Sequence, residues 1–213
     1  MTRGIEQLNN ITTEYEEYDI DTYFDVMDIS EEQKEKRKEV ADDLIWVFLL
    51  IFAIIKTSIE DGDLEYGFIF ETLRDSFRDV VYRYVEPSDY INAYIDRFTQ
   101  NVMNTTWDNM NFALDDYWLS DLRAFGLGLD EANSIMNHNE LQEAIEAGYT
   151  HKTWKAELIR TRKDHVEMHN TTIPILDYFV FPDCEMIAPH DEVNGTARQN
   201  ANCRCCLKFE KKN

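Results

Sequence analysis

The sequence is poor in the residues that interrupt regular secondary structure. Its 213 residues include only 7 glycines and 4 prolines. Because these residues mark turns and loops, their scarcity excludes a loop-rich or all-β chain. Cysteine is absent before residue 184, and the first 17 residues contain neither a basic nor an apolar segment of the kind found in secretory signals. The cysteines are therefore expected to be thiols or metal ligands in a reducing compartment, not disulfides.

Basic residues are also scarce. The chain has 42 acidic residues against 21 basic ones, a formal net charge of -21. This excludes a protein that coats nucleic acid or anionic lipid with its whole surface, so any DNA contact is expected to be local. The net charge is -22 over residues 1–150 and +1 over residues 151–213, which also hold all four cysteines and three of the four prolines. We therefore predict two units, 1–150 and 151–213.

Apolar and aromatic residues are plentiful, at 44% and 13%, and their spacing indicates helices in the first unit. Ser30 and Gln33 form a capping-box pattern at the start of a helix that ends at Gly62. Apolar residues recur at helical spacing over 64–85 and again over 88–118. The first unit is therefore predicted to be an acidic domain of long helices.

A run of 12 apolar residues, 44–55, lies inside the first of these helices. As a helix it measures about 18 Å, against about 30 Å for the hydrocarbon core of a membrane. We therefore predict a helix buried in protein, with a docking helix for another subunit as the alternative, and no membrane contact.

Other segments are predicted to be less regular. Residues 1–29 are expected to form a flexible acidic arm. Two glycines predict a turn over 125–129, with short helices capped by Asp130 and Asn139 after it. The second unit reads as short strands with a helical turn over 160–169. The whole chain is thus predicted to be α+β, with a small mixed core at its C-terminus.

Histidine and cysteine gather in the second unit. His165 and His169 are four residues apart and would share a helix face, and Cys203 and Cys205 would point to one side of a final strand. Two histidines and two cysteines suit a tetrahedral zinc ion. Three interpretations stay open: a structural zinc site, a hydrogen-bonded core without metal, and a catalytic metal. Further candidate ligands are Cys184, His190 and Asp191.

A nucleophilic cysteine paired with a histidine is a further alternative. Arg204 lies between Cys203 and Cys205 in the sequence, where its charge would lower a thiol pKa. No glycine-rich turn that could form an oxyanion hole accompanies these cysteines, which disfavours this interpretation.

An ordered set of short motifs runs through the second unit: Lys152-Thr153-Trp154, Arg160-Thr161-Arg162-Lys163-Asp164-His165, Pro174, Phe179, Pro189-His190-Asp191 and Asn202-Cys203-Arg204-Cys205. Over residues 150–209 this set resembles the C-terminal core of the phage Mu F-like minor head proteins, the phage head morphogenesis family. The chain departs from that family in two turns. Met168-His169-Asn170 replaces its usual Asp-Gly, and His190 replaces the glycine of its Pro-Gly-Asp turn. Cys206 adds a further thiol.

The resemblance implies a structural protein and not an enzyme. Such a protein is present in few copies in the capsid interior, is associated with the portal protein and other capsid components, and acts in head assembly or DNA exit after assembly in the host cytoplasm. The core motif it implies comprises Trp154, Arg160, Arg162, His165, Asp191, Asn202, Cys203, Arg204 and Cys205. The alternative is a metal-dependent hydrolase or nuclease with zinc on the His/Cys set and Asp191 or Glu167 as base. An acidic DNA mimic or host-directed inhibitor is a third hypothesis, based on charge alone.

Overall fold

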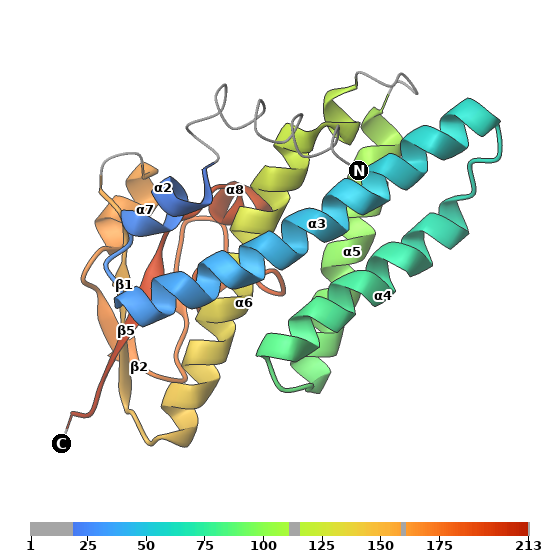
Figure 1. The fold of residues 1–213 in the computed structure, drawn as a ribbon. Helices are drawn as coiled ribbons and strands as arrows, with labels where there is room; N and C mark the ends of the chain where they lie inside the picture. Colours follow the sequence, from blue (N-terminus) through green and yellow to red (C-terminus); the bar gives the residue numbers. More distant parts are fainter. Residues whose placement is uncertain (1–18, 111–115, 159–160, 213) are drawn as a thin grey trace.

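The computed structural model describes residues 19–110, 116–158 and 161–212 (Figure 1). Long helices form the first part of the chain, and short antiparallel strands with two short helices form the second. The predicted α+β class is therefore confirmed. The predicted arm lies mostly outside the described residues. Its last part contains α2 (Ile20–Asp25), whose Tyr23 and Phe24 are buried in the helical core.

The helical part is built on α3 (Glu31–Asp61), which packs against α4 (Tyr66–Tyr84); α5 (Asp89–Asn109) packs on α4. Ser30 and Gln33 form the predicted capping box, and Gly62 ends α3 with a left-handed backbone at φ 73°. The helix predicted over 88–118 is shorter than expected. Met110 is already extended, and a separate 3-10 turn, η2, covers Tyr117–Leu119.

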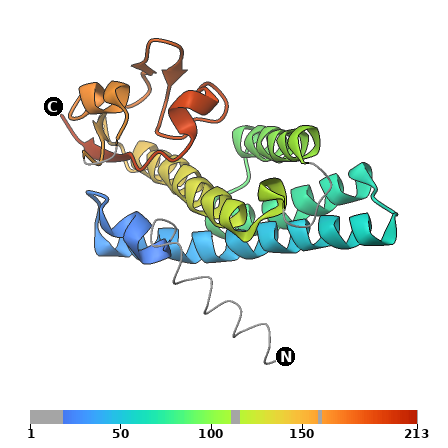
Figure 2. The ribbon, with the colours of Figure 1, turned by 90° about the horizontal axis from the view of Figure 1, so that it is seen from above.

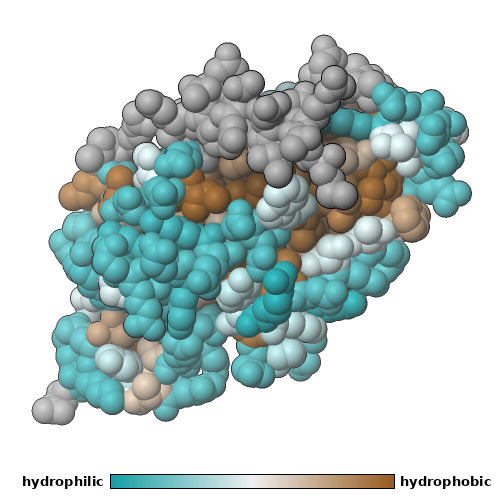
Figure 3. Space-filling model, viewed as in Figure 1, coloured by the Kyte–Doolittle hydropathy of each residue, from teal (hydrophilic) through white to brown (hydrophobic). Residues whose placement is uncertain are grey.

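The apolar run 44–55 lies in the middle of α3 and is mostly buried, as predicted. Its large exposed side chains are Trp46 and Leu50, which are 54% and 53% exposed and one helical turn apart, and the small Ala53 is exposed as well. Figure 3 shows an apolar band crossing this face of the molecule over the middle of α3. Among the described residues, no helix has the length and hydropathy needed to cross a membrane.

Helix α6 (Asp121–Glu146) corrects three predictions made from glycine and capping residues. It is continuous through 125–129, so the predicted turn and the helix starts at Asp130 and Asn139 are wrong. Gly128 has a packing role instead. A Cβ atom there would lie 2.5 Å from Cγ1 of Ile45, so its absence lets α6 approach α3 closely. A glycine in a helix can thus mark a tight crossing as well as a turn.

The C-terminal part contains two small antiparallel sheets. Its elements are β1 (His151–Lys155), α7 (Lys163–Met168), β2 (Thr172–Pro174), β3 (Phe179–Val180), β4 (Glu185–Met186), α8 (Ala197–Asn200) and β5 (Cys206–Glu210). One sheet has the order β2-β1-β5 and the other pairs β3 with β4. In the first, β1 pairs along its full length with β5, so that Trp154 lies opposite Leu207. Trp154 is at the centre of a second core, against Phe179 and Phe181.

Helix α6 joins the two parts. Figure 2 shows the C-terminal part at one end of the molecule, against the C-terminal half of this helix. Leu141 and Ala144 of α6 belong to the second core, whereas its earlier turns belong to the first. The division of the chain at residue 150 stays a prediction. The structure has two cores, and α6 contributes side chains to both of them.

Candidate metal centre

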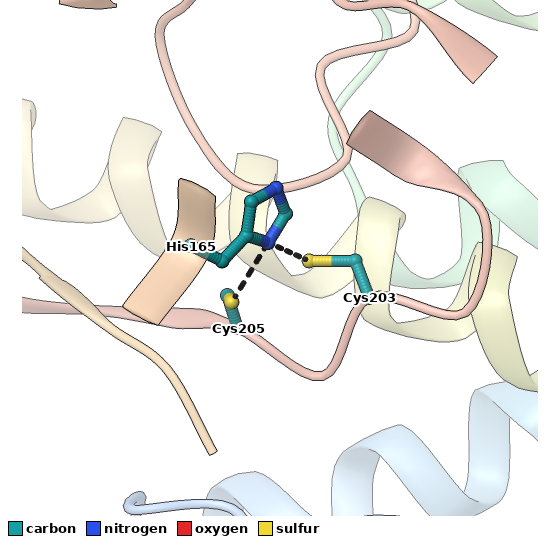
Figure 4. A group of neighbouring side chains, drawn as sticks. All are labelled: His165, Cys203 and Cys205. Atoms are coloured by element: carbon teal, nitrogen blue, oxygen red, sulfur yellow. Dashed lines mark hydrogen bonds between the residues drawn. The ribbon is translucent and has the colours of Figure 1, made fainter. Parts of the chain in front are cut away.

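The side chains of His165, Cys203 and Cys205 converge (Figure 4). The Nδ1 atom of His165 lies 3.4 Å from Sγ of Cys203 and 3.3 Å from Sγ of Cys205. The nitrogen and the two sulfurs all lie within 4.8 Å of one another. Helix α7 supplies the histidine, and the segment just before β5 supplies the cysteines. Three of the four predicted ligands therefore share one site.

His169 lies outside this group, contrary to the predicted helix face. Helix α7 ends at Met168, and His169 has an extended backbone with ψ 130°. The spacing of four residues therefore no longer places it above His165. Its Nδ1 instead accepts a hydrogen bond from the backbone N–H of Ala156, at 3.1 Å.

The two cysteines meet for a different reason from the one predicted. The strand begins at Cys206, so Cys203 and Cys205 precede it and no strand alternation applies to them. Their backbone is held from α6. Asn133 donates to the carbonyls of both cysteines, and Asn137 donates to that of Cys205. Side-chain hydrogen bonds from these two asparagines therefore hold the backbone at the cysteines, where the sequence pattern predicts a strand.

Gln199 fixes the orientation of the His165 ring. The Nε2 atom of His165 lies 3.0 Å from Oε1 of Gln199. The amide nitrogen of Gln199 donates to the carboxylates of Asp164 and Asp183, at 3.2 and 2.7 Å, so its oxygen must face the ring. An amide oxygen can only accept a hydrogen bond, so Nε2 carries the hydrogen and donates it. Nδ1 therefore presents its lone pair to the two sulfurs.

Each sulfur also has a nitrogen donor nearby. Trp154 packs edge-on against the His165 ring, and its buried Nε1 has no hydrogen-bond partner of ordinary geometry among the described residues. This N–H lowers the pKa of the Cys205 thiol, because it favours the thiolate. The ring of His190 hydrogen-bonds the backbone carbonyl of Cys203, and it lowers the pKa of the Cys203 thiol.

The two thiols have opposite pKa shifts. Burial raises the pKa of both, but the hydrogen bond from Cys205 and the charge of His190 outweigh it and hold the pKa of Cys203 well below its usual value. Burial and the neighbouring Cys203 hold the pKa of Cys205 well above it. The pair thus favours one thiolate beside one thiol.

All three side chains are buried, with exposed fractions of 1% for His165, 3% for Cys203 and 0% for Cys205. A catalytic zinc needs a position that substrate can reach, whereas a structural zinc is closed off. The arrangement is therefore suited to cross-linking α7 to the chain before β5.

The remaining motif residues hold the surrounding backbone. Arg162 donates to the backbone carbonyls of Gln199 and Ala201. Arg204 lies over the ring of Tyr23, 4.7 Å from its centroid. The backbone N–H of Asn202 donates to Asp130. Arg160 lies outside the described residues.

Asp191, a candidate ligand and base, is occupied within its own loop. Its carboxylate accepts from the backbone N–H groups of Ile187, Val193 and Asn194 and from the hydroxyl of Tyr90. The other candidates also lie outside the three-residue group. Cys184 is half-buried, and burial raises the pKa of its thiol. Glu167, the alternative base, forms an exposed ion pair with Lys163.

Sequence reasoning missed the residues that support the site, above all Gln199, Asp164 and Asp183. A lone glutamine next to short polar residues carries no signal by itself, because its role depends on which chain segments meet it. Asp164 directly precedes His165 and was visible in the motif, but its contact with Gln199 arises only in the fold.

No family model matches this chain, and neither the curated proteins nor the solved structures contain a match.

Proposed function

We propose that this chain is a structural phage protein of the minor head class, which associates with the portal inside the capsid and works through protein contacts. The observation that carries the proposal is the convergence of the motif residues. Trp154, His165, Cys203 and Cys205 share one buried cluster, and Arg162 binds the loop that leads to the cysteines. The motifs that carry the resemblance thus act as a single packing unit.

The two turns that depart from the family pattern also support the proposal. Asn170 ends the segment Met168-His169-Asn170 that replaces the family's Asp-Gly, and its φ is 67°. His190 stands at the glycine of the Pro-Gly-Asp turn, and its φ is 60°. This left-handed region favours glycine and is costly for other residues. Both turns thus have the backbone conformation that a glycine there would adopt most readily.

The buried cluster favours this proposal over the hydrolase or nuclease alternative. Water and substrate would need access to a metal-bound position for such chemistry. The three side chains are almost completely enclosed, and the carboxylate of Asp191 is taken up by backbone N–H groups of its own loop.

Helix α3 offers the surface for the portal contact. Trp46 and Leu50 lie one helical turn apart on it, and both are more than half exposed. Exposed aromatic residues are enriched at protein interfaces. The first 150 residues carry a net charge of -22, which favours a basic partner surface and repels packaged DNA. DNA contact is therefore proposed only for the near-neutral C-terminal part.

The test is to produce the chain together with the portal protein of the same phage and to measure complex formation by size-exclusion chromatography with light scattering. The double variant Trp46→Lys, Leu50→Lys removes the proposed contact. Leu176→Lys is the matched control, because Leu176 is 64% exposed and lies in the C-terminal part. We expect a complex with the wild type and the control, and its loss with the double variant.

Two results would contradict the proposal. One is the absence of the chain from the portal complex and from purified procapsids. The other is zinc-dependent hydrolysis of DNA or of a model ester by the purified protein that disappears in Cys203→Ser, which would favour the enzyme alternative.

A further inference from the structure

We propose that Nδ1 of His165 and the sulfurs of Cys203 and Cys205 bind one Zn²⁺ ion, which has a structural role. The proposal rests on the geometry of this cluster and is independent of the proposed function, because a protein of any function can carry such an ion.

The distances suit a shared ion. With bonds of about 2.05 Å to nitrogen and about 2.3 Å to sulfur, two ligands of a tetrahedral zinc lie about 3.6 Å apart. The observed separations between Nδ1 of His165 and the two sulfurs are 3.4 and 3.3 Å. A shift of a few tenths of an ångström therefore accommodates the ion. Thiolate and imidazole ligands favour zinc over Mg²⁺ or Ca²⁺, which take oxygen ligands.

A cluster without metal is held only by pairwise hydrogen bonds. Because Nε2 of His165 carries the hydrogen and faces Gln199, Nδ1 has a single lone pair. Both Cys203 and Cys205 lie at hydrogen-bond distance from that one lone pair. Hydrogen bonds can join the three atoms only in pairs, with one thiol donating to Nδ1 or to the other sulfur, whereas a cation between the three atoms contacts all of them.

The surroundings of the three atoms match those of metal ligands. Histidine ligands usually donate their other ring N–H to an oxygen, as His165 does to Gln199. The buried N–H of Trp154, which lacks an ordinary partner among the described residues, is a donor suited to a thiolate at Cys205. A thiolate accepts such hydrogen bonds better than a thiol does. The ring of His190 hydrogen-bonds the backbone carbonyl of Cys203 and so lies next to that ligand as well.

The ion would connect residues that are about 40 positions apart in a small core of short strands. Cores of this size commonly depend on a metal or a disulfide. The group has three protein ligands among the described residues, one fewer than most structural zinc sites. Because all three side chains are almost completely enclosed, the fourth ligand of the ion would be a small molecule such as water held inside the core, at a position that no substrate reaches.

The first test measures metal on the full chain as purified under reducing conditions. We expect about one zinc per chain by elemental analysis, a stoichiometry that follows from the single site. After removal of zinc with a chelator, added Co²⁺ should give the intense visible bands of a tetrahedral site and the near-ultraviolet bands of thiolate ligation. Folded protein with no zinc and no such bands in the presence of Co²⁺ would overturn the proposal, whatever the variants do.

The second test compares variants within the chain. Cys203→Ser and His165→Gln should lose the zinc and the thiolate bands. Two matched controls, Cys184→Ser and His169→Gln, alter a cysteine and a histidine outside the group and should keep both. Loss of zinc in the controls with retention in Cys203→Ser would place the ion elsewhere and overturn the assignment.

Discussion

Arg37 on α3 and Glu140 on α6 form a buried two-point ion pair. The Nη1 and Nη2 atoms of Arg37 lie 2.5 and 2.9 Å from the two carboxylate oxygens of Glu140. The same guanidinium donates to the side-chain oxygens of Asn133 and Asn137. Those two amides in turn bind the carbonyls of Cys203 and Cys205. One arginine of the helical part therefore orients the residues that position the candidate metal centre.

Arg37→Ala should destabilise the protein by about 3–5 kcal/mol, because it leaves a buried carboxylate without its partner. The double variant Arg37→Met, Glu140→Leu should cost less than the single one, since it removes both charges. Urea denaturation followed by circular dichroism measures the free energies of unfolding. A loss below about 1 kcal/mol for Arg37→Ala, the size of an exposed pair, would contradict this role.

Gln199→Leu should weaken zinc binding by about 10- to 100-fold, as is typical when the outer partner of a metal-binding histidine is removed. Because this buried side chain also binds Asp164 and Asp183, circular dichroism of the variant checks that the fold persists. Competition with a chromogenic chelator measures the affinity. Arg198→Leu is the neighbouring control, because its guanidinium pairs with Asp164 at the surface. Equal affinities in Gln199→Leu and the wild type would argue against the assigned tautomer of His165.

Glu131→Gln should stabilise the protein more at high pH than at low pH. Burial, then repulsion from Glu192, raises the pKa of Glu131 well above its usual value, although the hydrogen bond from Tyr94 lowers it. The folded state therefore holds this proton more tightly than the unfolded state. Stability is lost as the pH rises above the unfolded value of 4.5 towards the folded pKa.

The glutamine variant cannot lose a proton, so its melting temperature should exceed that of the wild type by more at about pH 8 than at about pH 4. Glu86→Gln, at an exposed loop position, should show no such trend. The same difference between Glu131→Gln and the wild type at both pH values would mean that Glu131 is not protonated in the fold.

Asn170→Gly should change stability little, whereas Asn170→Val should cost about 1–2 kcal/mol or more, because a β-branched residue is strained at a φ of 67°. The glycine variant loses only an exposed hydrogen bond from Lys155. Thermal unfolding compares the two. A valine variant as stable as the wild type would show that this turn does not need a left-handed residue.

Limited proteolysis should cut the chain between Gly148 and Lys152, with the exposed turn around Gly148 as the preferred position. The two fragments should remain associated in native buffer, because Leu141 and Ala144 of α6 lie in the C-terminal core and amides of α6 bind the carbonyls of Cys203 and Cys205. Size-exclusion chromatography of the cut protein, with and without denaturant, tests this. Fragments that separate in native buffer would indicate two independent domains.

The sequence by itself determined the elements whose signals are local. The capping box at Ser30 and the stop at Gly62 fixed both ends of α3, because these residues bond within a single turn of the chain. The length of the apolar run 44–55 indicated burial in protein. The stripe over 64–85 predicted α4, because helical periodicity needs no knowledge of the partner it packs against.

Tertiary structure decided what depends on contact between distant segments. From the sequence, Gly128 predicts a turn. In the fold, α3 packs against it so closely that a Cβ atom would not fit. The spacing of His165 and His169 predicts a pair of ligands on one helix face, but α7 ends between them. Only the fold brings Gln199 to His165 and the amides of α6 to the cysteine carbonyls. The sequence identified side chains that can ligate zinc, but only the fold shows that three of them lie together. Ligation depends on distances between residues far apart in the sequence, and residue spacing does not determine these distances.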